Sequence, residues 1–164
     1  AAFSGTGKTT LIKKIVSILS KRFTVSVIKH AHHDFDLDHP GKDSYEIRKS
    51  GAENMLISSK NRWALMHENN YHDELSLIDL LGNLDNLKYD LILIEGFKTE
   101  SFPKIELYRE EISKNRGLLS ESDENIVAIA TENVTILNTN LVVLDINKPQ
   151  DIVNFIINFL DIDK

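Results

Sequence analysis

The stretch SGTGKTT, residues 4–10, decides the fold class, because it directly precedes a segment with helical periodicity. Gly7, Lys8 and Thr9 satisfy the end of the phosphate-loop (Walker A) pattern G-x-x-x-x-G-K-[ST], whereas Ala2 stands at the first glycine of that pattern. Alanine is tolerated in such a turn when its φ angle is negative. The stretch therefore predicts a loop that binds the phosphates of a nucleotide.

The residue types of this loop fit the chemistry of phosphate binding. Gly5 and Gly7 allow consecutive backbone N–H groups to turn toward phosphate oxygens, and the N-terminus of the following helix adds further donors. Lys8 supplies a positive charge for the β- and γ-phosphates, and the Thr9 hydroxyl is a ligand for Mg²⁺. The alternative is a glycine-rich turn before an ordinary helix. Because the whole chain has only 7 glycines, two of them at these positions favour the phosphate loop.

Composition and length limit the classes of protein that come into question. The 164 residues, 41% of them hydrophobic, suit a single domain over residues 1–164 with a core of its own. Nineteen Lys and Arg residues against 25 Asp and Glu residues give a net charge of −6, which argues against a nucleic-acid partner. The chain has no cysteine, and no apolar run approaches the roughly 18 residues of a membrane-spanning helix. We therefore expect a cytoplasmic protein with no membrane or nucleic-acid partner.

Apolar periodicity predicts an alternation of helices and strands. The predicted helices cover residues 9–22, 43–50, 75–84 and 149–160. The predicted strands cover residues 25–28, 55–57, 63–66, 91–94, 105–107, 126–130 and 141–144. This order indicates the α/β class, specifically a three-layer P-loop NTPase-type domain whose mostly parallel sheet is flanked by helices. We expect extra antiparallel strands near residues 53–68 and 104–109.

A phosphate loop connects a strand to a helix, whereas only Ala1 precedes the pattern here. We therefore expect the natural chain to begin earlier, with a strand of about 5 to 8 residues upstream of Ala1. This strand would lie at the centre of the sheet.

A second acidic site follows the apolar run of residues 91–94. Glu95 and Gly96 come at the carboxyl end of this predicted strand, where P-loop folds place an acidic residue that holds Mg²⁺. The alternative is a strand-end acid that faces water. Asp43 is another candidate carboxylate for Mg²⁺, but together with Glu46 it also matches a D-x-x-E capping box. Spacing alone leaves both interpretations of Asp43 open.

Residues 30–39 contain four histidines and three aspartates. The aspartates imitate the start of an EF-hand calcium loop, but His39 at the sixth position and Tyr45 at the twelfth exclude one. The histidine spacing fits no standard zinc or nickel framework, although such a site stays an alternative. We favour a polar ligand-binding or switch loop.

Candidate base-binding residues follow the predicted strand 126–130. Thr131 and Glu132 lie where the loops of nucleotide-binding sheets reach the base, and an acidic side chain there would accept N–H groups of guanine. No N-K-x-D pattern is present, so spacing alone leaves the choice between guanine and adenine open. Arg62 is a candidate contact for an anionic ligand, and no arginine-rich lid loop occurs.

Several further runs carry a family resemblance: residues 2–10, 28–34, 40–45, 62–65 and 95–98. The K-H-x-H-H, P-G-K-D-S and E-G-F-K patterns, in this order, are much more specific than the phosphate loop alone. Nearly end to end, the chain resembles the molybdopterin-guanine dinucleotide biosynthesis adapter proteins of bacteria, a P-loop GTP-binding family. The resemblance implies a homodimer that binds GTP with Mg²⁺, hydrolyses it weakly and assists the guanylyltransferase that attaches GMP to molybdopterin.

The motifs and the resemblance together give a predicted site. Nucleotide binding is assigned to Ser4, Gly5, Thr6, Gly7, Lys8, Thr9, Thr10, Thr131 and Glu132. Metal binding is assigned to Thr9, Asp43 and Glu95. A loop near the nucleotide or the pterin partner is assigned Lys29, His30, His32, His33, Lys42 and Arg62.

The leading hypothesis is a GTP-binding adapter in molybdenum cofactor biosynthesis, with GTP and Mg²⁺ as cofactors and a guanylyltransferase and molybdopterin as partners. Fast GTP hydrolysis needs a water-positioning residue and an arginine at the γ-phosphate, which is worth about 10³ to 10⁵ in rate. The sequence assigns neither, so we expect at most a weak Mg²⁺-dependent GTPase. Two alternatives stay open: a small-molecule kinase or ligase on the same scaffold, and a nucleotide-gated metal chaperone that uses the histidine-rich loop.

Overall fold

The computed structural model describes residues 1–31, 35–69, 74–113, 115–135 and 137–163. They form two compact units, one of residues 1–30 and 80–164 and the other of residues 31–79. In chain order the elements are α1 (Lys8–Leu19), β1 (Val25–Lys29), α2 (Asp43–Lys49), β2 (Asn54–Ser58), β3 (Trp63–His67), α3 (Leu77–Gly82), β4 (Leu91–Glu95), β5 (Lys104–Tyr108), α4 (Glu110–Ser113), the 3₁₀ turn η1 (Leu119–Glu121), β6 (Ile126–Thr131), β7 (Val142–Asp145) and α5 (Pro149–Leu160). Among these described segments, no helix has the length and apolar character needed to cross a membrane.

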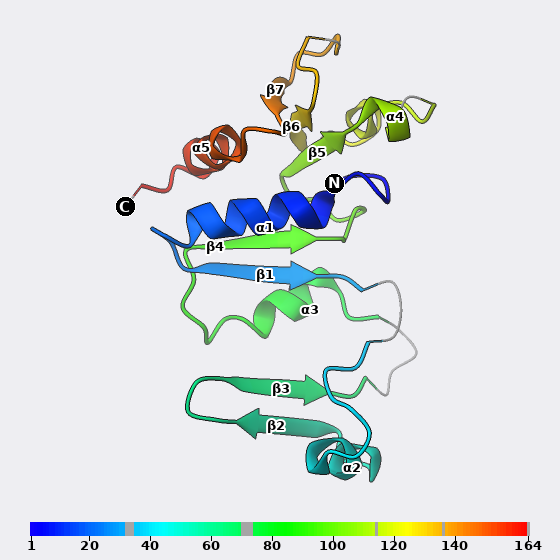
Figure 1. The fold of residues 1–164 in the computed structure, drawn as a ribbon, viewed down its shortest axis with the longest axis vertical. Coiled ribbons are helices and arrows are strands. Elements are labelled where there is room, and N and C mark those ends of the chain that lie inside the picture. Colours follow the sequence, from blue (N-terminus) through cyan, green and yellow to red (C-terminus); the bar gives the residue numbers. More distant parts are fainter. Residues whose placement is uncertain (32–34, 70–73, 114, 136, 164) are drawn as a thin grey trace. The chain divides into compact units, whose positions relative to one another are not determined.

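The strands of the larger unit run parallel (Figure 1). β1 pairs with β4 from Val25 opposite Leu91 to Lys29 opposite Glu95. β5, β6 and β7 form a second parallel group in that order. Since parallel strands end on the same side, the carboxyl ends within each group meet at one edge. The predicted α/β class with mostly parallel strands flanked by helices is confirmed.

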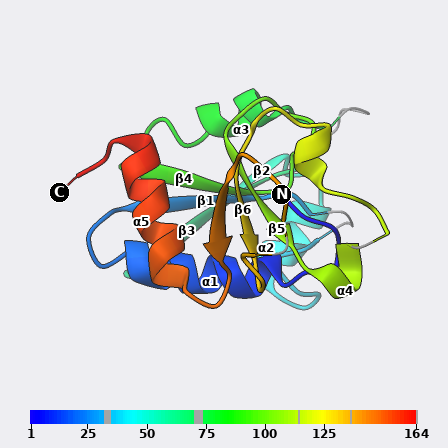
Figure 2. The same ribbon diagram turned by 90° about the horizontal axis from the view of Figure 1, so that it is seen from above.

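One hydrophobic core joins the helices and strands of the larger unit. Its members recur at the i, i+3 and i+4 spacing of a buried helix face and along the inner face of the strands. They include Leu11, Ile15 and Leu19 of α1, Ile152, Val153 and Ile156 of α5, and Ala128, Ala130 and Leu144 of β6 and β7. α1 and α5 contact each other (Figure 2). Burial of each large aliphatic side chain contributes about 2 kcal/mol, so this core fixes the helix that begins at the phosphate loop.

Ala1 lies beside β5 as the last residue of a parallel strand would. Its nitrogen donates to the carbonyl of Ile105 at 2.7 Å, and its carbonyl accepts from the Leu107 amide at 2.8 Å. These two hydrogen bonds bracket Glu106 in the manner of a parallel pair. The phosphate loop therefore begins directly at a strand-like residue. The strand expected upstream of Ala1 stays a prediction.

The expected antiparallel strand near residues 104–109 is wrong, because β5 pairs in parallel with β6. The connection between the two strands holds α4 and η1 and is long enough for a crossover. Within β5, Glu106 is only 1% exposed. Its carboxylate accepts the backbone N–H groups of Leu119 and Ser120 at 2.8 and 3.0 Å, so this acid fixes η1 from inside the unit.

The smaller unit is organised around Arg48, the buried residue of α2. Its guanidinium forms ion pairs with Asp36 and Glu68 and lies over the Tyr45 ring. The hydrogen bond from Arg48 lowers the pKa of Asp36. Asp36 is one of the three aspartates that imitate a calcium loop, and its carboxylate forms an ion pair with Arg48. The antiparallel pair predicted near residues 53–68 is confirmed as β2 and β3.

Of the two interpretations left open for Asp43, the capping box with Glu46 is not found in the structure. The residue before the helix is Lys42, and no side chain caps the start of α2. Glu46 instead accepts the backbone N–H of Gly41 at 3.3 Å. Asp43 is the first helical residue, where a carboxylate is favoured by the helix dipole.

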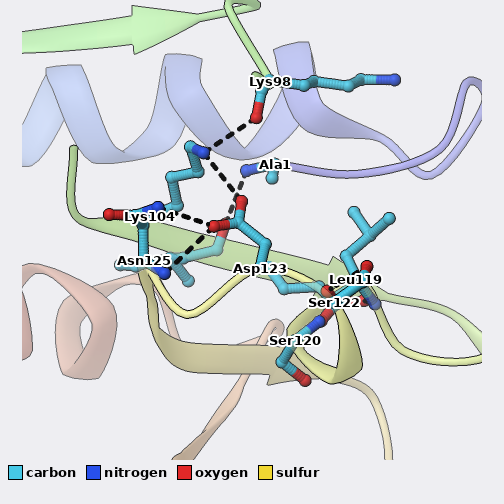
Figure 3. Close-up of polar contacts among 10 residues, drawn as sticks. Ala1, Lys98, Lys104, Leu119, Ser120, Ser122, Asp123 and Asn125 are labelled. Carbon is cyan, nitrogen blue, oxygen red and sulfur yellow. Dashed lines mark hydrogen bonds and ion pairs between the residues drawn. The ribbon is translucent and has the colours of Figure 1, made fainter. Parts of the chain in front are cut away.

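A buried ion pair anchors the start of β5 (Figure 3). The Lys104 side chain is 4% exposed, and its ammonium donates to the Lys98 carbonyl at 2.8 Å and to the Asp123 carboxylate at 2.7 Å. Asp123 also accepts from the backbone and side-chain nitrogens of Asn125, at 3.0 and 2.9 Å. The hydrogen bond from Lys104, followed by that from the Asn125 side chain, lowers the pKa of Asp123 from 3.8 to about 2.

Replacing Asp123 by Asn tests this anchor. At neutral pH we expect D123N to lower the free energy of unfolding by about 3 kcal/mol, because the buried Lys104 ammonium loses its anionic partner. The lowered pKa of Asp123 stabilises the fold above pH 3.8, and this contribution is lost as the pH falls toward 2. Urea unfolding at a series of pH values should therefore show the difference between wild type and D123N shrinking over that window.

The exposed Arg22–Asp163 pair is the matched control, with side chains 50% and 93% exposed. D163N should change the free energy of unfolding by less than about 1 kcal/mol. Equal losses in D123N and D163N would contradict the anchoring role of Asp123.

Candidate functional site

The loop between Ala1 and α1 has the backbone conformation that the phosphate-loop prediction requires. Gly5 and Gly7 have φ angles of +84° and +89°, in the left-handed region that favours glycine. Gly7 is also the residue that caps the N-terminus of α1. Ala2 is not among the described residues with positive φ, so alanine fits at the first position of the pattern.

The Thr6 side chain stabilises this loop through a hydrogen bond within it. It is completely buried, and its hydroxyl donates to the carbonyl of Phe3 at 2.9 Å. The Gly7 carbonyl accepts the Leu11 amide at 3.1 Å, which continues the helix. The carbonyls of Phe3 and Gly7 are therefore both hydrogen-bonded within the loop and α1, which fixes the loop to the start of this helix.

Lys8 lies over the loop that it follows. Its ammonium donates to the carbonyls of Ala2 and Phe3, at 3.3 and 3.1 Å. Partial burial lowers the pKa of Lys8, as do the positive charges of Lys98 and Lys29, whereas Glu95 raises it. Negative phosphate oxygens beside Lys8 would offset both the cost of burying its ammonium group and its repulsion by Lys98 and Lys29.

Thr9 and Glu95, two of the residues predicted to bind metal, lie in contact. The Thr9 hydroxyl donates to one carboxylate oxygen of Glu95 at 3.2 Å, and Lys29 pairs with the other oxygen at 3.2 Å. The Glu95 side chain is only 14% exposed. A hydroxyl and a carboxylate beside a phosphate loop are the oxygen donors that Mg²⁺ takes together with nucleotide phosphates, so the residues present fit this ion. Their metal-binding role stays a prediction.

Close packing fixes the strand ends at this site. Gly96 has a φ of +115°, and a Cβ there would lie 2.4 Å from the Cβ of His30. The His30 amide donates to the Glu95 carbonyl at 2.8 Å, and the rings of His30 and Phe97 lie 4.9 Å apart. His30 therefore packs at the ends of β1 and β4, beside the predicted metal residues.

A residue at the end of β5 contacts the phosphate loop at Thr6, and it pairs with a residue at the end of β6. Arg109, directly after β5, donates from Nε to the Thr6 carbonyl at 2.8 Å and pairs with Glu132, directly after β6. Thr131 is 3% exposed and lies within β6. The base-binding roles assigned to Thr131 and Glu132 stay predictions.

The remaining predicted residues are not brought into this cluster by described contacts. Lys42, Asp43 and Arg62 belong to the smaller unit. His32 and His33 lie outside the described residues. Among the residues that the structure does describe, no group of three His, Asp or Glu side chains is arranged to hold a metal ion.

Sequence reasoning missed two basic residues near the loop. Lys98 was noted only as part of the E-G-F-K run, and its charge acts on Lys8. Arg109 belongs to no motif in the sequence, yet its Nε donates to the Thr6 carbonyl, 103 positions away. A single sequence carries no signal for such a long-range contact.

The loop, the helix it caps and the carboxylate at a neighbouring strand end define the class of P-loop α/β proteins. Comparison with known proteins narrows this class. The family model described as "Molybdopterin guanine dinucleotide synthesis protein B" (MobB) matches residues 1–132. The molybdopterin-guanine dinucleotide biosynthesis adapter protein of Escherichia coli K12 is 44% identical over 161 residues, covering 98% of this chain and 90% of the relative.

A further relative supports the family, and a solved structure supports the fold. The adapter protein of Haemophilus influenzae is 40% identical over 159 residues, covering 96% of this chain and 85% of the relative. The crystal structure of Bacillus subtilis MobB superposes with a TM-score of 0.72 at 23% identity, covering 96% of this chain and 93% of that one. The chain belongs to the MobB family.

Substitution of Gly96 tests how tightly the strand ends are packed. We expect G96A to lower the free energy of unfolding by about 3 kcal/mol, because the new Cβ combines an unfavourable φ with overpacking against His30. G82A is the control, since a Cβ at Gly82 meets no atom within 4 Å and its φ is not positive. Thermal unfolding of both variants measures this loss of stability. A G96A protein as stable as G82A would contradict the close packing of Gly96 against His30.

Proposed function

We propose that this protein is a nucleotide-binding adapter of molybdopterin guanine dinucleotide biosynthesis that binds GTP with Mg²⁺. The observation that carries the proposal is the phosphate loop, with left-handed Gly5 and Gly7 and with Thr9 in contact with Glu95. Membership of the MobB family supports the adapter role over a small-molecule kinase or ligase. The metal-chaperone alternative depends in part on His32 and His33, which the structure does not describe.

The phosphate end of GTP would occupy the N-terminus of α1. Backbone N–H groups of residues 4–9 and the Lys8 ammonium would bind its β- and γ-phosphates. Mg²⁺ held by Thr9 and Glu95 would neutralise phosphate charge. Lys29 pairs with one oxygen of the Glu95 carboxylate, whose other oxygen accepts from Thr9. Asp43 stays a predicted further carboxylate for the ion.

Weak hydrolysis follows from the groups available. An arginine accelerates GTP hydrolysis when its guanidinium meets the charge that develops on the γ-phosphate. Two arginines contact the loop: Arg109 donates to the Thr6 carbonyl and is neutralised by Glu132, and Arg116 lies over the Phe3 ring. We therefore propose that GTP turnover by the protein alone is slow.

The partners proposed are the guanylyltransferase that joins GMP to molybdopterin, and molybdopterin itself. The names of the relatives support this assignment, since they are adapter proteins of molybdopterin-guanine dinucleotide biosynthesis. Such a role belongs in the cytoplasm, as predicted from the sequence. Lys42, Arg62 and the histidines after β1 are the residues proposed to face these partners.

Titration with GTP and ATP, each with and without Mg²⁺, tests the proposed function. Calorimetry should show Mg²⁺-dependent binding of GTP that is tighter than binding of ATP. K8A should weaken GTP binding at least about 100-fold, because a charge-assisted contact to phosphate is lost. K14A, which removes an exposed lysine of the same helix, should bind GTP like the wild type. Equal affinity in K8A and K14A would remove the phosphate-loop assignment.

We further propose that the protein forms a homodimer through the hairpin of β2 and β3. Leu56, Trp63 and Leu65 lie on one face of this hairpin and are 58%, 56% and 52% exposed. An apolar face of this kind is typical of a protein interface.

Light scattering after size exclusion tests the homodimer. The wild type should have twice the chain mass of 18.7 kDa, whereas L65D should have the single mass because a charge enters the apolar face. I78D is the control, since Ile78 is 78% exposed but belongs to α3. A dimer that persists in L65D would contradict this use of the hairpin.

A further inference from the structure

Arg109 joins the phosphate loop to the strand edge at which a nucleotide base would lie. It directly follows β5, and Glu132 directly follows β6, and the two strands are neighbours with Tyr108 opposite Thr131. Both side chains therefore leave the same edge of the sheet. From there the guanidinium reaches the loop, where Nε donates to the Thr6 carbonyl at 2.8 Å and Nη1 pairs with Glu132.

The Thr6 carbonyl needs a partner because of how a phosphate loop works. When consecutive N–H groups turn inward to an anion, the carbonyls between them turn outward. An outward carbonyl of a buried residue that lacked a hydrogen bond would destabilise this conformation. Thr6 is completely buried, and Arg109 supplies the donor in a charge-assisted bond.

The guanidinium also lies against Gly7. A Cβ placed on Gly7 would be 3.7 Å from Nη2 and 3.9 Å from Nε of Arg109. Arg109 thus contacts the residue that caps α1, at the place where the helix dipole attracts anions. Its side chain is 32% exposed, so it is packed against the loop for much of its surface.

We propose that Arg109 is a positioning residue of the phosphate loop, and that Glu132 holds Arg109 in place rather than reading the base. This inference rests on the proposed function, and it assigns both residues to the triphosphate end of the ligand. The order of the loop between Phe3 and Gly7 depends on the guanidinium, and the guanidinium is oriented by the carboxylate of Glu132. The affinity for phosphate and the conformation of the loop after β6 are therefore coupled.

A ligand without a base separates this role from base recognition. We suggest calorimetric titration with Mg²⁺–GTP and with Mg²⁺–tripolyphosphate of the wild type, R109K, R109A and E132Q. R109A should weaken the binding of both ligands by the same factor, about 10- to 100-fold, as expected for loss of a charged hydrogen bond. R109K should lose about 10-fold for both, because a lysine cannot hold Thr6 and Glu132 at once. E132Q should show a smaller loss, again equal for the two ligands.

A second readout distinguishes positioning from a general loss of stability. Amide hydrogen exchange of Gly5, Thr6 and Gly7 in the free protein should be faster in R109A, while amides of α5 keep their wild-type rates. R22A is the matched control, because Arg22 forms an exposed pair with Asp163 and should affect neither binding nor exchange.

The outcomes separate this inference from the proposed function. If R109A and R109K bind both ligands as the wild type does, Arg109 does not position the loop, although GTP binding stands. If E132Q loses affinity for GTP alone, its carboxylate reads the base and the proposed role of Glu132 is overturned. If the wild type binds neither ligand, the proposed function fails and this inference fails with it.

Discussion

The left-handed turns at Gly5 and Gly7 are the constraint on which the rest of the site depends. With these φ angles, the N–H groups of the loop can face a common centre at the N-terminus of α1, where the helix dipole favours negative charge. The same turn directs carbonyls outward, and those of Phe3 and Thr6 accept hydrogen bonds. Phe3 accepts from Thr6 and Lys8, and Thr6 accepts from Arg109.

Parallel pairing explains why distant residues meet at this loop. In the register of β1 and β4, Lys29 stands opposite Glu95, and in that of β5 and β6, Tyr108 stands opposite Thr131. The residues at the strand ends therefore lie on two sides of the loop: Lys29 and Glu95 on the Thr9 side, and Arg109 and Glu132 on the Thr6 side. The hydrophobic core beneath α1 holds this arrangement in place.

Much of this could be predicted from local sequence. The phosphate-loop pattern, the helix periodicity of α1 and α5 and the apolar runs of β4 and β6 are all short-range signals, and the structure agrees with them. The error in the strands arose where a long-range contact overrides a local pattern. Residues near 104–109 were expected to form an antiparallel strand, but β5 pairs in parallel with β6, and its Glu106 is buried and holds η1.

Arg109 shows most clearly which contacts a single sequence does not predict. Nothing near it in the sequence distinguishes it from a surface arginine, and its partner Thr6 lies 103 positions away. Arg109 reaches Thr6 only because the end of β5 lies next to the phosphate loop in the folded protein. Lys98 is similar, since its effect on Lys8 is electrostatic and depends on the turn after β4.

Backbone amide NMR during titration with Mg²⁺–GTP tests the central claim most directly. If the loop amides bind a triphosphate, the resonances of Gly5, Gly7 and Lys8 should shift first and furthest, with saturation at one nucleotide per chain. If these resonances stay unchanged at millimolar GTP while the protein remains folded, this loop does not bind the nucleotide.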